Sequence, residues 1–128
     1  MVLGFKENFV DKILDGSKIH TIREDKKNRW KAGNKIHFAT GIRSKDYNCF
    51  KEGKCFATEK IFIDKRKRII LIEGQELSET TMNCLAVNDG FKRTLELFSF
   101  FPEPFTGKII HWTRGTYIEA NPAQEATS

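Results

Sequence analysis

The stretch CFATEKIFIDKRKRIILIE, residues 55–73, decides the fold class that we predict. Residues 55–63 alternate between two faces, one of which carries Glu59, Ile61 and Ile63, and a period of two is typical of a β-strand. Residues 69–73 are rich in β-branched side chains and predict a second strand. The charged residues 64–68 between them predict a turn, so the stretch is expected to form an antiparallel hairpin with a cationic tip.

Further strands are predicted on both sides of this hairpin. Residues 19–23 are rich in β-branched side chains, and residues 35–40 alternate with Ile36 and Phe38 on one face. The turn at residues 30–34 joins these two strands, and we expect them to be neighbours. The polar residues 41–54 predict a long loop or a ragged hairpin, and residues 107–112 predict a last strand.

Three segments carry helix signals. Residues 6–15 have helical spacing of apolar side chains and end at Gly16, which fits the position just after a helix C-terminus. Ser78 is a suitable N-cap for a helix that ends near residues 88–90, and residues 91–101 predict another helix before Pro102. Because helices and strands do not alternate as in βαβ units, we predict an α+β domain with a mostly antiparallel, barrel-like sheet.

The composition suits one compact soluble domain. Of the 128 residues, 39% are hydrophobic and 30% are charged, which excludes a disordered or fibrous chain. No apolar run approaches the roughly 20 residues of a membrane span, and the N-terminus lacks signal-peptide features, so we expect a cytoplasmic protein with no membrane partner. Three cysteines without a C-x-x-C pair indicate neither disulfides nor zinc. The polar tail, residues 115–128, is expected to be disordered and to follow a domain of residues 1–114.

The charge is distributed unevenly along the chain. Residues 1–70 hold 18 Lys and Arg against 9 Asp and Glu, whereas residues 71–128 hold 4 against 8. A basic half favours a polyanionic or phosphate-bearing partner, and a solvated surface is the plain alternative.

The segment GSKIHTIR, residues 16–23, holds the best candidates for chemistry. Thr21 and Arg23 share one face of a predicted strand, and Lys18 lies where the strand begins, so the three could line one pocket. The alternative is a solvated lysine, a β-forming threonine and an exposed arginine. His20, His37 and His111 show no ligand spacing, so no metal site is predicted. Common nucleotide, hydrolase and zinc motifs are absent from the sequence.

Three segments together resemble the ASCH domain. They are ILDGSKIHTIR at 13–23, WKAGNKIHF at 30–38 and LAVNDGF at 85–91, and they match the family's I-x-x-G-x-K-x-x-T-x-R start, G-[DN] turn and A-x-x-[DE]-G-F segment. The resemblance covers roughly residues 4–113. ASCH domains are similar to PUA domains, so it implies a PUA-like β-barrel flanked by short helices. It also implies a cleft under the first helix that binds RNA or a modified nucleoside, with no cofactor.

The resemblance also implies roles for particular residues. Lys18, Thr21, Arg23 and Asp89 would line the cleft. One bacterial ASCH branch removes the acetyl group from acetylcytidine with a lysine, a threonine and a glutamate. Carried over, Lys18 would activate Thr21 and Asp89 would replace the glutamate. Asn-Asp-Gly is also a common turn or cap. A third possibility is a non-catalytic protein-interaction domain that uses an exposed aromatic stretch at Phe98, Phe100 and Phe101.

Further candidate ligand contacts lie outside these motifs. Trp30 could stack on a base at the mouth of the cleft, whereas Trp112 is expected in the core. The hairpin tip could provide a phosphate-facing rim beside the cleft, and the alternative is that its charges only keep the tip soluble. These tip residues are Lys65, Arg66, Lys67 and Arg68.

Overall fold

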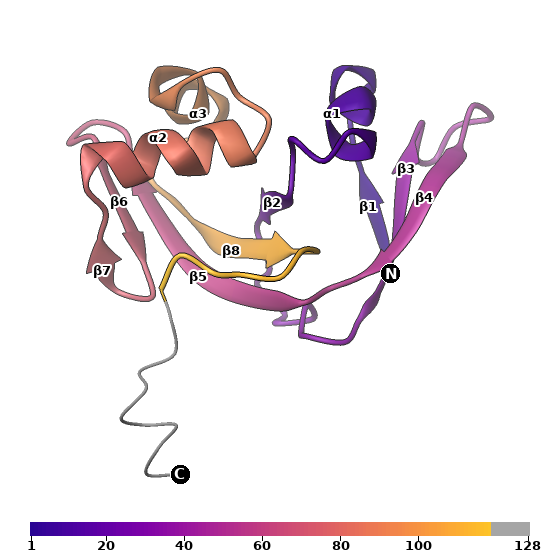
Figure 1. Ribbon diagram of the computed structural model, residues 1–128, viewed down its shortest axis with the longest axis horizontal. Helices are drawn as coiled ribbons and strands as arrows, with labels where there is room; N and C mark the ends of the chain where they lie inside the picture. The colour runs from indigo at the N-terminus through magenta and orange to yellow at the C-terminus, as the bar shows by residue number, and fades with distance from the viewer. Residues whose placement is uncertain (119–128) are drawn as a thin grey trace, which may run out of the picture.

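In the computed structural model, which describes residues 1–118, the strands form two separate sheets (Figure 1). The larger sheet has the order β2-β8-β5-β6-β7, and every neighbouring pair in it is antiparallel. Its strands are β2 (His20–Arg23), β5 (Ala57–Asp64), β6 (Ile69–Ile72), β7 (Gln75–Glu76) and β8 (Phe105–His111). The predicted hairpin of residues 55–73 is confirmed as β5 and β6.

The smaller sheet has the order β1-β3-β4, with β1 (Val2–Gly4), β3 (Lys35–Thr40) and β4 (Asn48–Lys54). β1 runs parallel to β3, whereas β3 and β4 are antiparallel with a register shift between Phe38 and Ala39. Residues 41–47 therefore form a connecting loop, and residues 48–54 form a strand whose hairpin partner is β3. Two residues after β4, the same chain continues as β5, so one long bent segment connects the two sheets (Figure 1).

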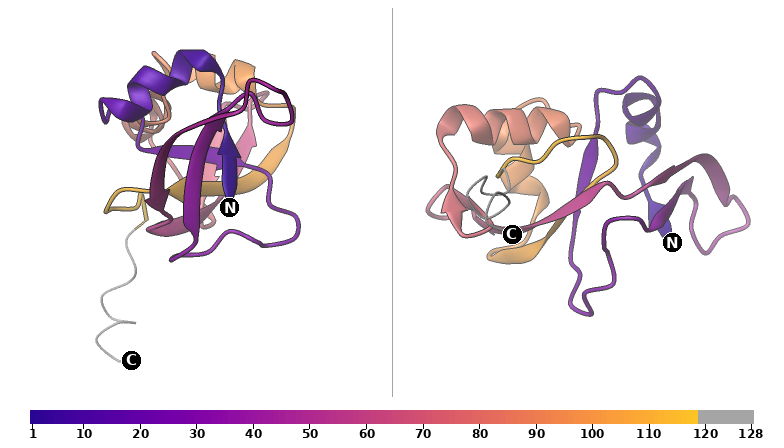
Figure 2. Two further views of the ribbon diagram at one scale, coloured as in Figure 1. Left: turned by 90° about the vertical axis from the view of Figure 1, so that its right-hand side faces the viewer. Right: turned by 60° about the horizontal axis from the view of Figure 1, so that its bottom comes forward.

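The helices lie together on one side of both sheets (Figure 2). A 3-10 turn, η1 (Glu7–Phe9), leads into α1 (Val10–Leu14), and α2 (Glu79–Asn88) is followed by α3 (Thr94–Phe100). The Ser78 side chain accepts a hydrogen bond from the Thr81 backbone N–H, which confirms the predicted N-cap of α2. Gly16 has φ +87°, as expected for a glycine just after a helix.

The apolar side chains form two clusters that share strand β8 as a wall. Ile22 and Ile109 belong to the first cluster, together with buried side chains of β5, β6, α2 and α3. Ile110 belongs to the second cluster, with side chains of residues 3–13, β3 and Trp30. Because side chains alternate across a strand, consecutive residues of β8 reach different clusters.

The α+β class and the mostly antiparallel pairing are confirmed, but the closed barrel is wrong. Within residues 1–118, β2 and β7 are the edges of one sheet and β1 and β4 are the edges of the other. The predicted neighbours, residues 19–23 and 35–40, lie in different sheets, because β2 pairs with β8 and β3 pairs with β1 and β4. Alternation along the chain shows that a segment is a strand but not which strand it pairs with.

The folded part of the chain continues past residue 114, since Tyr117 and Ile118 pack against the first cluster. The rest of the predicted tail, residues 119–128, lies outside the described residues. Within residues 1–118, no helix has the length and apolar character needed to cross a bilayer.

Candidate functional site

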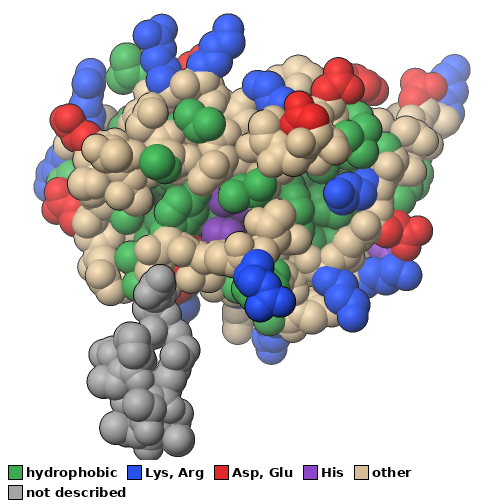
Figure 3. All heavy atoms as spheres, in the orientation of Figure 1, with side chains coloured by type: hydrophobic (Ala, Val, Ile, Leu, Met, Phe, Trp, Pro, Cys, Tyr) green, Lys and Arg blue, Asp and Glu red, His purple; other side chains and the backbone are tan. Residues whose placement is uncertain are grey.

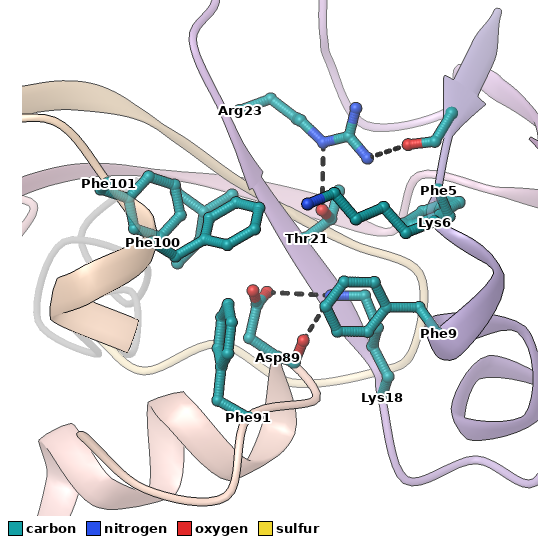
Figure 4. A pocket seen from close by; sticks show the side chains of 12 residues that line it. Phe5, Lys6, Phe9, Lys18, Thr21, Arg23, Asp89, Phe91, Phe100 and Phe101 are labelled. Carbon is teal, nitrogen blue, oxygen red and sulfur yellow. Dashed lines mark hydrogen bonds and ion pairs between the residues drawn. The ribbon is translucent and has the colours of Figure 1, made fainter. Parts of the chain in front are cut away.

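A cavity of about 240 Å³ lies where the first helical turn, strand β2 and the segment between α2 and α3 meet. Figure 4 shows aromatic side chains around a group of charged and polar side chains. The lining residues are Gly4, Phe5, Lys6, Phe9, Lys18, Thr21, Ile22, Arg23, Asp89, Phe91, Phe100 and Phe101. The cavity therefore brings together the four residues predicted from the sequence and the resemblance, namely Lys18, Thr21, Arg23 and Asp89.

Lys18 lies at the bottom of this cavity and is only 2% exposed. Its Nζ donates to the Asp89 carbonyl oxygen at 2.5 Å and lies 3.4 Å from Asp89 Oδ1. The same ammonium group lies 4.8 Å from the centre of the Phe9 ring. Burial lowers the pKa of Lys18 from its ordinary value, the Asp89 carboxylate opposes this, and the Arg23 charge lowers the pKa further. The alternative of a solvated lysine is therefore wrong.

Asp89 follows α2 directly and is almost fully buried. Its backbone N–H donates to the Leu85 carbonyl, and the chain then turns at Gly90, where φ is +98°. The Asp89 side chain does not cap α3, whose N-cap is Arg93. Instead, Asp89 Oδ1 lies 2.8 Å from His20 Nδ1. The turn at residues 88–90 thus places a carboxylate beside the Lys18 ammonium.

Thr21 and Arg23 are next to each other on the same face of β2, as the strand period predicts. Arg23 Nε donates to Thr21 Oγ1 at 3.1 Å, and Arg23 Nη2 donates to the Gly4 carbonyl at 2.5 Å. The guanidinium also lies 5.0 Å from the centre of the Phe5 ring. Among the described residues, Lys18 and Thr21 line the same cavity without a hydrogen bond between them.

The aromatic walls were not identified from the sequence. Phe9 and Phe91 meet edge to face with ring centres 6.0 Å apart, and Phe91 and Phe100 are 5.3 Å apart. They come from η1, from the segment after α2 and from α3. Phe91 is the last residue of the A-x-x-D-G-F segment, and this motif was the feature of the sequence that could have identified it as a wall residue. Rings from three separate elements thus form an apolar wall of the cavity that also holds the charged groups.

Comparisons of this chain with family models, curated proteins and solved structures found no match. The chemistry of the cavity therefore rests on the geometry of its own residues.

The three histidines differ in burial. His20 and His111 are fully buried, with ring centres 5.2 Å apart, whereas His37 is partly exposed. His111 Nε2 lies 2.7 Å from Glu59 Oε1. Among the described residues, no group of three or more His, Cys, Asp or Glu side chains has a metal-binding arrangement.

Of the two tryptophans, Trp30 is the more deeply buried. Trp30 is 8% exposed and lies in the second cluster, so the prediction that it stacks on a base is wrong. The backbone N–H of Trp30 donates to Asp25 Oδ2, and its carbonyl oxygen accepts from Lys108 Nζ. These bonds hold the loop between β2 and β3 against β8, with the indole directed inward. Trp112, expected in the core, is only partly buried against the same cluster.

The basic hairpin tip does not contribute to the lining of the cavity. Arg23 is level with Lys60, because both pair with Lys108, and Lys65 follows five residues later, which is about 16 Å at the rise of a strand. The residues Lys65, Arg66, Lys67 and Arg68 are absent from the cavity lining. On the face shown in Figure 3, Lys and Arg side chains are spread around the periphery, with Asp and Glu among them.

The aromatic stretch proposed as a partner surface is largely internal. Phe98 and Phe101 are buried, and Phe100 alone of the three is exposed, at 49%. Two of the three rings proposed as a protein-interaction surface are therefore not accessible to a partner.

Proposed function

We propose that the cavity binds a planar polar heterocycle, namely a modified nucleoside or a single base of RNA. The observation that carries this proposal is the combination of aromatic walls with Lys18, Thr21, Arg23 and Asp89 in one space of about 240 Å³. Pockets for drug-sized ligands measure roughly 300–1,000 Å³, so this space suits a smaller, base-sized group. Flat rings stack on aromatic side chains, and nucleobases carry polar edges that charged groups can recognise.

The free hydrogen-bonding groups of the cavity also fit a base edge. Asp89 Oδ1 is engaged by His20 and Lys18, whereas Asp89 Oδ2 makes no hydrogen bond among the described residues. No enclosed side-chain oxygen or nitrogen in this part of the chain lacks a partner, so Oδ2 is open to the cavity. It can accept from a ligand N–H, while the Thr21 hydroxyl can donate to a carbonyl or ring nitrogen.

The sequence resemblance supports the same class of ligand. Two of the three segments that resemble ASCH domains, 13–23 and 85–91, supply Lys18, Thr21, Arg23, Asp89 and Phe91 to this single cavity. On this basis we also propose a PUA-like arrangement for the domain.

Calorimetric titration with cytidine and acetylcytidine tests the binding proposal, with ribose 5-phosphate as a ligand that lacks a base. We expect the two nucleosides to bind and ribose 5-phosphate not to bind. Asp89→Asn should weaken nucleoside binding about tenfold or more, or about 1.4 kcal/mol, because the amide replaces a charged acceptor. The matched control is Asp46→Asn, which changes an exposed loop residue. Equal binding of all three ligands, or of both variants, would contradict the proposal.

A second function, hydrolysis of an acylated cytidine, is favoured by the state of Lys18. Burial lowers the pKa of this lysine in the cavity that also holds Thr21, and a lysine with a lowered pKa can act as a base near neutral pH. Thr21 Oγ would attack the amide carbonyl as Lys18 takes its proton. Collapse of the tetrahedral adduct would break the C–N bond, return that proton to the nitrogen of the departing cytidine, and leave an acyl-threonine that water hydrolyses.

Acetate release from acetylcytidine tests this second function. Turnover should rise with pH toward the lowered pKa of Lys18, and Lys18→Ala and Thr21→Ala should each abolish it. Asp89→Glu should increase it, because the resembling hydrolase branch has glutamate at this position. No acetate release by the parent protein or by Asp89→Glu between about pH 6 and 10, a range around a moderately shifted lysine, would exclude hydrolysis.

A further inference from the structure

A chain of buried hydrogen bonds runs from the cavity to the segment that follows β8. Asp89 Oδ1 lies 2.8 Å from His20 Nδ1, and His20 Nε2 lies 2.6 Å from the Tyr117 hydroxyl oxygen. Asn88 Nδ2 donates to the same hydroxyl oxygen at 2.9 Å. His20 thus connects a carboxylate that lines the cavity to a tyrosine from a different part of the chain.

The donors and acceptors of this chain have one consistent order. The Asp89 carboxylate can only accept, so His20 Nδ1 carries a proton and donates to it. In a neutral imidazole Nε2 is then an acceptor for the Tyr117 hydroxyl proton, while the Tyr117 oxygen accepts from Asn88. The bond from Nδ1 holds Asp89 Oδ1 away from the cavity.

Tyr117 is itself held by a second carboxylate. The backbone N–H groups of Tyr117 and Ile118 donate to Glu59 Oε1 and Oε2 at 2.9 and 2.8 Å. Glu59 Oε1 also lies 2.7 Å from His111 Nε2. Burial of Glu59 raises its pKa, but these hydrogen bonds lower the pKa by more than burial raises it. The pKa of Glu59 is therefore below its ordinary value, and the group is a carboxylate at neutral pH. The backbone of residues 117–118 is thereby fixed on β5.

We propose that His20 is a positioning residue for the cavity and that Asp89 and Tyr117 together hold its tautomer. In this arrangement Asn88, Tyr117 and His20 orient Asp89 so that Oδ2 faces the ligand. The role in ligand binding rests on the proposed function, whereas the order of the hydrogen bonds does not. Residues 117–118, which the sequence places in the polar tail, then help to position the carboxylate of the cavity.

Long-range ¹H–¹⁵N NMR spectra of the full chain test the hydrogen-bond order without any ligand. We expect His20 to be neutral at pH 7 with its proton on Nδ1, although free histidine favours Nε2. Tyr117→Phe should shift both His20 nitrogen signals toward the other tautomer, whereas the control Tyr47→Phe, at an exposed tyrosine, should shift neither. A parent His20 protonated on Nε2 would overturn the proposal.

Cytidine titrations test the positioning role. Asn places an N–H near the position of histidine Nδ1, so His20→Asn should retain more affinity than His20→Phe, which we expect to bind more than tenfold more weakly than the parent. Tyr117→Phe should weaken binding about threefold to tenfold, and Tyr47→Phe should not change it. Equal losses for His20→Asn and His20→Phe would overturn the positioning role. Nδ1-protonated His20 without nucleoside binding by the parent would overturn the proposed function and leave the hydrogen-bond order standing.

Discussion

One methyl group added at Gly90 should act on both the stability of the domain and the shape of the cavity. Gly90 follows Asp89 and has φ +98°, a conformation that side-chain-bearing residues rarely adopt. A Cβ atom there would lie 2.9 Å from Phe9 Cε1 and 3.2 Å from Lys18 Cδ. Both neighbours line the cavity, and the Phe9 ring is a rigid body packed against Phe91.

Gly16 provides the matched control for this substitution. Its φ is +87°, but nothing lies within 4 Å of an added Cβ. Gly16→Ala should therefore cost only the backbone strain, about 1–2 kcal/mol. Gly90→Ala should cost the same strain plus the displacement of Phe9 and Lys18, and overpacking of this kind adds about 1–3 kcal/mol. The expected loss for Gly90→Ala is the sum, about 2–5 kcal/mol.

Urea denaturation of the two variants and the parent, followed by fluorescence and circular dichroism, measures this difference. Cytidine titration of the folded variants then separates the effects, because Gly90→Ala should weaken binding whereas Gly16→Ala should not. Equal losses of unfolding free energy in the two variants, together with unchanged binding, would refute the argument that Gly90 is required by close approach of the cavity wall.

Three further predictions concern other parts of the chain. Trp30→Ala should lower the free energy of unfolding by about 3–5 kcal/mol, as for other large core truncations, and a loss below about 1 kcal/mol in urea denaturation would contradict the core position. Burial lowers the pKa of His20 below its ordinary 6.5, against the opposing effect of Asp89, so the unfolded chain takes up this proton first as the pH falls. The free energy of unfolding should thus decline below about pH 6.5 until the folded His20 is protonated, and denaturation at several pH values should show a smaller slope for His20→Phe. Replacing residues 65–68 together by serine should reduce the salt dependence of oligonucleotide binding and leave cytidine binding unchanged, and weaker cytidine binding would show that the tip reaches the cavity.

Local signals predicted the elements that depend on neighbouring residues alone. The hairpin of β5 and β6 followed from alternation on both sides of a charged turn, and the N-cap at Ser78 from a hydroxyl just before a helix. Lys18, Thr21 and Arg23 were brought together because a strand and the residue before it fix their relative positions. These parts of the fold and the site could be predicted because they depend only on residues close together in the sequence.

Features that depend on distant pairing were not accessible. β2 pairs with β8, which lies more than 80 residues further along the chain, and β1 has only three residues and no periodic signal. The burial of Trp30 depends on bonds to Asp25 and Lys108, which composition does not indicate. The contact between His20 and Tyr117 spans 97 positions, and only the tertiary structure brings the two rings together.

The wall formed by β8 has a consequence for how the domain opens. Ile109 and Ile110 are both completely buried, but each completes a different apolar cluster. Displacement of β8 would therefore expose both clusters to water at once. Subglobal opening of one half alone is therefore disfavoured. The slowest amide hydrogens of both sheets should exchange with solvent through one shared transition, with a common free energy equal to that of global unfolding.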